Sequence, residues 1–103
     1  MAKISSFVKL SAQPGKRGEL LDAMRTMLPA VAEEPGTEVY SFHTDSADEN
    51  ALWIFELYTD QAALDAHGSS AAMVNLFGLL GPLLDGAPLM VFATPTDAEG
   101  LTI

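Results

Sequence analysis

The sequence predicts an α+β domain of the ferredoxin-like class, with the split order β-α-β-β-α-β and a four-stranded antiparallel sheet. Four segments have the apolar patterns of strands, and the two segments between them repeat apolar residues at helical three-and-four spacing. The 103 residues, 49% of them hydrophobic, suit a single globular domain. We expect one domain over 1–103, with a core over 3–95 and a C-terminal tail over 96–103.

Residues 3–12 are predicted to form the first strand, which the turn residues Pro14 and Gly15 end. From Lys16 to the break at 34–36, apolar residues recur on one helical face. Pro29 lacks an N–H and crowds the preceding turn, so we expect a kink or a weakened turn near Arg25.

Residues 37–45 and 52–58 are predicted to pair as a hairpin, with 52–58 as the central strand. The central strand is apolar on both alternating faces apart from one carboxylate, Glu56, which shares a face with Ile54 and Tyr58. Two helices would cover only one side of the sheet, so the other apolar side would be exposed in a monomer. We therefore expect a homodimer; the alternative is that an edge loop or the tail covers this side. The expected interface residues are Trp53, Phe55 and Leu57.

Residues 60–85 are predicted to form two helical pieces. Asp60 is a suitable N-cap for the first piece, because its carboxylate can accept from free backbone N–H groups. A break and a second N-cap are expected at 67–70. The last short strand is expected at 89–93.

Composition restricts partners and compartment. A net charge of −9 argues against a nucleic-acid partner, whose phosphates require a basic surface. The absence of cysteine excludes disulfides and thiolate metal sites and favours a reducing cytoplasm. The start of the chain has no long apolar segment, and no apolar run reaches the roughly 20 residues that span a bilayer. We expect a soluble cytoplasmic protein with no membrane association.

Glu56 and His67 are the candidate catalytic residues. All five lysine and arginine residues lie within the first 25 positions, so we expect His67 to be the partner of Glu56. Glu56 would orient His67, which would remove a proton from a bound substrate, and Tyr58 would bond the substrate oxygen. The alternative is structural: a buried Glu–His contact that anchors a helix to the sheet, with Tyr58 as packing.

No cofactor is expected. No glycine-rich phosphate loop follows a strand, which leaves nucleotide cofactors unsupported. His43, His67 and Glu56 lack a recognisable metal-ligand spacing, and His43 is expected at the surface or an interface.

Several short motifs, in their order and spacing, resemble the antibiotic biosynthesis monooxygenase family, most closely its small quinol-monooxygenase-like members. The resemblance covers roughly residues 3–95. It implies a dimeric α+β barrel in which two sheets face each other, with a ligand cavity between sheet and helices in each subunit. The motifs are Pro14-Gly15, Glu34-Pro35-Gly36 followed by Tyr40, Glu56-Leu57-Tyr58, and Ala63 through His67 to Ser70.

Departures from the family pattern narrow the implied chemistry. The haem-degrading members use an asparagine and a histidine where this chain has Val8 and Phe77. The oxygenases of aromatic polyketide biosynthesis use an asparagine and a tryptophan where this chain has Ile54 and Tyr58. The resemblance therefore implies the quinol-oxygenase-like group. The residues expected to line the pocket are Val8, Ile54, Met24, Met73 and Phe77.

Residue pattern and resemblance together predict a cofactor-independent monooxygenase. Its substrates would be O₂ and a small aromatic quinol or phenol bound in the sheet–helix cavity. The alternative is a non-catalytic dimeric module of the same fold that binds a small ligand or serves a structural role.

Overall fold

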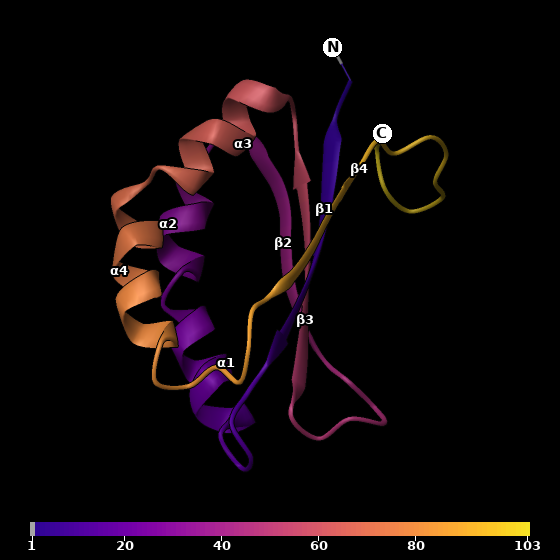
Figure 1. Cartoon of the computed structure of the whole chain (residues 1–103). Helices are drawn as coiled ribbons and strands as arrows, with labels where there is room; N and C mark the ends of the chain where they lie inside the picture. Colours follow the sequence, from indigo (N-terminus) through magenta and orange to yellow (C-terminus); the bar gives the residue numbers. More distant parts are fainter. Residues whose placement is uncertain (1) are drawn as a thin grey trace.

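The computed structural model describes residues 2–103 and has the predicted order of strands and helices. The sheet is antiparallel with the strand order β2-β3-β1-β4, and the helices lie on one face of it (Figure 1). The predicted α+β ferredoxin-like fold is therefore confirmed. The elements are β1 (Ile4–Ser11), α1 (Arg17–Arg25), α2 (Leu28–Ala32), β2 (Thr37–Thr44), β3 (Ala51–Tyr58), α3 (Gln61–Gly68), α4 (Ala71–Leu80) and β4 (Leu89–Ala93).

Local sequence signals account for where the helices begin and end. Where a kink or a weakened turn is expected near Arg25, the structure has a full interruption: α1 ends at Arg25, and Pro29 lies in the first turn of α2, where its missing N–H is not needed. Asp60 accepts from Ala63 N at 2.9 Å and begins α3, while Ser70 begins α4 as its N-cap. Within residues 2–103, no helix combines the length and apolar character needed to cross a membrane.

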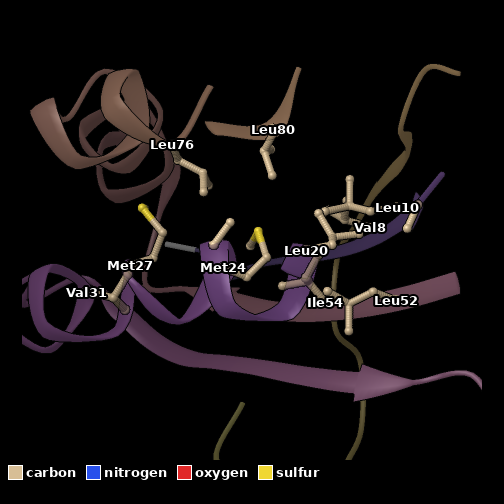
Figure 2. Close-up of a cluster of buried hydrophobic side chains, with 12 residues drawn as sticks. Val8, Leu10, Leu20, Met24, Met27, Val31, Leu52, Ile54, Leu76 and Leu80 are labelled. Atoms are coloured by element: carbon tan, nitrogen blue, oxygen red, sulfur yellow. The ribbon is translucent and has the colours of Figure 1, made fainter. Parts of the chain in front are cut away.

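The central position predicted for β3 is confirmed, because it pairs with β1 on one side and β2 on the other. Its inner face, toward the helices, carries Ile54 opposite Val8 and Glu56 opposite Ser6. The main hydrophobic core fills the space between this face and the helices (Figure 2). Its buried members are Val8, Leu10, Ala12, Leu20, Ala23, Met24, Met27, Val31, Leu52, Ile54, Leu76 and Leu80.

The outer face of the sheet carries several apolar side chains and is only partly covered. Phe7 is 44% exposed and stacks at a tilt on the half-buried Phe55, with 5.4 Å between ring centroids. Leu57 has no exposed surface in the single chain, so it adds no free area to the expected interface. The C-terminal segment lies on this side of the sheet (Figure 1), and Lys3 Nζ donates to the carbonyl of Thr102. The tail therefore returns to one end of the outer face.

Candidate functional site

A cavity of about 510 Å³ lies between the inner face of the sheet and the helices. This volume falls in the usual range for small-molecule sites. Its wall is mostly apolar, with a few polar groups contributed by Tyr40, Glu56, Asp65, His67 and Ser69. The five residues expected from the sequence to line a pocket all lie in the wall: Val8, Ile54, Met24, Met73 and Phe77.

The partner of His67 differs from the sequence-based expectation. His67 Nδ1 lies 2.8 Å from Oε1 of Glu34, which follows α2, and this contact replaces the expected hydrogen bond to Glu56. The same oxygen accepts from Thr37 Oγ1 at 2.8 Å. Glu34 is therefore fixed on one side by a hydroxyl and holds the imidazole on the other.

This contact determines which nitrogen of His67 is available for chemistry. A carboxylate only accepts hydrogen bonds, so the Nδ1 that faces Glu34 carries the proton, and Nε2 of the neutral ring has a free lone pair. Nε2 is buried and has no hydrogen-bond partner among the described residues. His67 is 3% exposed and forms part of the cavity wall. His67, a residue of the cavity wall, thus contains an unused acceptor and a potential base, and this nitrogen is covered by protein in the single chain.

Close packing holds the imidazole in place. The rings of Tyr40 and Tyr58 lie 5.3 and 5.4 Å from the His67 ring, centroid to centroid. A Cβ at Gly36 would collide with the side chain of Ala63 on α3, so only glycine lets the turn after Glu34 approach this helix so closely. Glu34 and His67, far apart in the chain, are positioned against each other by this approach.

Glu56 is buried in the cavity wall and accepts a hydrogen bond from the hydroxyl of Tyr58. Burial raises the pKa of Glu56 above its usual value, against the opposing effects of the Tyr58 hydrogen bond and of His67 when its ring is protonated. Burial and the contact with Glu56 raise the pKa of Tyr58, which keeps its proton. Tyr58 is fully buried and lies outside the cavity wall, so the expected direct contact of its hydroxyl with substrate is replaced by contact with Glu56.

Two site residues were missed from the sequence. Glu34 is expected from the sequence as part of a turn and of a family-like motif but is given no site role, although a carboxylate at a helix end is a possible histidine partner. Tyr40 lines the cavity directly across from Glu56 in the β2–β3 register, which the alternation of β2 could have indicated.

The remaining candidates lie away from the cavity. Trp53 Nε1 donates to Asp45 Oδ2 at 2.8 Å, and Lys9 Nζ lies 5.7 Å from the centre of its ring. His43 Nε2 lies 2.9 Å from Ser41 Oγ on β2. Within residues 2–103, no group of three or more histidine, aspartate or glutamate side chains is placed to hold a metal ion.

Solved structures and curated sequences of similar proteins agree with this fold. The structure of a "putative antibiotic biosynthesis monooxygenase" from Caulobacter crescentus matches with a TM-score of 0.88 and 27% identity, over 93% of this chain and 92% of that one. The structure of Rv0793 from Mycobacterium tuberculosis matches with a TM-score of 0.85 and 26% identity, over 94% of this chain and 98% of that one.

Sequence comparison finds the same mycobacterial protein, named "Putative monooxygenase Rv0793". It is 27% identical over 94 residues, which cover 91% of this chain and 92% of the relative. The "Uncharacterized protein sll1783" of Synechocystis is 33% identical over 58 residues, 56% of this chain. That match spans only 40% of the length of the Synechocystis relative.

The family model for "Antibiotic biosynthesis monooxygenase" matches residues 4–77. The matched segment runs from the start of β1 into α4 and contains Glu34, Glu56 and His67. The sequence resemblance, the fold and this match agree, and the chain belongs to the antibiotic biosynthesis monooxygenase family.

Proposed function

We propose that this chain is a cofactor-independent monooxygenase that acts on a small aromatic quinol or phenol in the sheet–helix cavity. The observation that carries the proposal is the buried Nε2 of His67, which has a free lone pair in a residue of the apolar cavity wall, while Nδ1 of the same ring contacts the carboxylate of Glu34. Family membership supports monooxygenase chemistry. The site adds the residue that would begin it.

The reaction would start with proton transfer from the substrate hydroxyl to His67 Nε2. Glu34 would stabilise the resulting imidazolium through Nδ1. The electron-rich anion would then pass an electron to O₂, and the two radicals would join in a carbon–oxygen bond. The peroxide would take up the proton and lose water, which leaves a carbonyl on a ring carbon that carried hydrogen. One oxygen atom enters the product and the other leaves as water, so no external reductant is required.

Glu56 would serve as the second proton-handling group. It lines the same cavity as His67, and burial makes it hold its proton more firmly than an exposed glutamate does. Two titratable groups in different environments suit a reaction that removes one proton and later returns one. We assign the first task to His67 and the second to Glu56.

We also propose that the protein functions as a homodimer joined through the outer face of the sheet. Exposed apolar side chains gather there, including Phe7 and, on the edge strand β4, Leu89 and Val91 at 53% and 47% exposure. A second copy would present the same apolar face, and such a self-complementary contact is the commonest way to form a dimer. The half-buried Trp53 and Phe55 would lie within this contact.

Oxygen uptake with a panel of quinols and hydroxyanthrones tests the catalytic proposal. We expect His67→Ala to lower the rate by about 10²- to 10⁴-fold, the usual contribution of a general base. Glu34→Gln should also lower the rate, because an amide can donate to Nδ1 and favour the tautomer with a proton on Nε2. His43→Gln is the matched control and should retain the wild-type rate. A wild-type rate in His67→Ala would refute the proposed base, and no uptake with any compound would favour the non-catalytic binding module.

Sedimentation velocity at micromolar concentration tests the dimer. The wild-type protein should sediment with twice the mass of one chain. Phe7→Asp places a charge in the proposed interface and should yield monomers. Leu28→Asp is the matched control, because Leu28 lies on the helical side of the molecule and is 42% exposed, close to the 44% of Phe7. This variant should remain dimeric. A monomeric wild type would contradict the proposal.

Unfolding in urea at several pH values tests the environment of Glu56. Since its pKa is raised in the folded chain, the folded state binds more protons than the unfolded state between the usual pKa of 4.5 and the raised one. Stability should therefore fall as pH rises through this window. Glu56→Gln removes this loss, so the stability of the variant relative to wild type should increase as pH rises above 4.5 and stay constant above the raised pKa. If the free energy of unfolding of the two proteins changed with pH in the same way, the raised pKa of Glu56 would be contradicted.

A further inference from the structure

We infer that the cavity selects uncharged aromatic ligands whose hydroxyl group lies at one end, and that it rejects aromatic anions. This inference rests on the proposed function for the choice of site and names the substrate class of that site. It is carried by the charges in the cavity wall and by the order of polar and apolar groups along it.

Among residues 2–103, none that lines the cavity carries a fixed positive charge. None of the five lysine and arginine residues, all of which lie in the described part of the chain, belongs to the wall. Each has another partner. Three of them form ion pairs: Lys3 with Glu38, Lys16 with Glu19, and Arg25 with Asp22. Arg17 donates to the backbone carbonyls of Asp45, Asp48 and Ala51. Lys9 lies over the ring of Trp53.

An anionic ligand would therefore lose hydration without gaining a countercharge. A carboxylate moved out of water is strongly destabilised unless a cation or several donors replace the solvent. The wall instead offers two acidic side chains, Glu56 and Asp65, and the carboxylate of Glu34 lies behind His67. Where these carboxyl groups are ionised, their negative charge opposes the binding of an anion further.

Polar groups occupy one end of the inner sheet face. Tyr40 and Ser6 lie on either side of Glu56, and the ring of Tyr40 packs near His67. In the next row along the sheet, the residues that line the cavity are apolar: Ile54, Val8 and Met90. Leu10, which follows on β1, also lines the cavity. A ligand with its hydroxyl toward His67 would thus place hydrocarbon, and no charged substituent, over the remaining rows.

The mouth of the cavity is also apolar. Phe77 on α4 and Met90 and Phe92 on β4 line the cavity and are 60%, 52% and 52% exposed. Flat aromatic rings pack well against such side chains. Entry and binding therefore favour the same neutral, aromatic class.

Three stable probes separate charge from size: 2-naphthol, 6-hydroxy-2-naphthoate and its methyl ester. The acid carries its carboxylate at the end opposite the hydroxyl, and the neutral ester is the larger molecule. Calorimetry at about pH 7.5, where carboxylates are ionised and phenols are not, gives the three dissociation constants. We expect the acid to bind at least about tenfold more weakly than both neutral probes. Equal or tighter binding of the acid would overturn the inference, as would failure of both neutral probes to bind.

Substitution of Phe77 tests the electrostatic cause. Phe77 lies at the mouth and is mostly exposed, so Phe77→Lys adds a cation without emptying the core. This variant should bind the acid better relative to the ester, whereas Phe77→Gln, the neutral control, should keep the wild-type ratio. An unchanged ratio in Phe77→Lys would overturn the inference. These binding ratios do not depend on turnover. If the cavity binds the probes selectively but the protein takes up no oxygen, the proposed function is refuted and the inference about ligand charge stands.

Discussion

The organisation of the site follows from one electrostatic constraint: its carboxylates have no lysine or arginine beside them. Glu34 and Glu56 are mostly buried, and a buried acid must be hydrogen-bonded or lose its charge. Neutral donors fill this need, with Thr37 and His67 at Glu34 and Tyr58 at Glu56. The packing of the turn after α2 against α3 therefore serves both to satisfy Glu34 and to fix the imidazole.

Most of the fold could be predicted from the sequence, because local signals and burial pattern agree. Pro29 divides the first helical region, Asp60 begins α3, and the two-sided apolar strand containing Glu56 lies in the middle of the sheet. These features depend on residues within a few positions of one another. The burial of Leu57 could not be predicted in this way, because it depends on the complete three-dimensional packing of the chain.

The candidate site could be predicted only in part. Glu56 and His67 are expected from the sequence as site residues, and both line the cavity. Their expected pairing rests on the assumption that the partner of the Glu56 carboxylate is a positively charged side chain. The actual donor, Tyr58, lies two residues along the same strand face. The partner of His67 is separated from it by 33 residues and meets it through the close approach at Gly36. Such a contact depends on tertiary packing, which residue spacing does not encode.

The central claim is that Glu34 leaves Nε2 of His67 as the free base of the cavity. Long-range ¹H–¹⁵N NMR of the imidazole nitrogens tests it most directly, with the His43→Gln protein used so that a single histidine is observed. At a pH where His67 is neutral, we expect the proton on Nδ1 and the chemical shift of an unprotonated nitrogen for Nε2. A neutral ring with its proton on Nε2 would contradict the claim, because the nitrogen on the side of the ring away from Glu34 would then be unable to accept a proton.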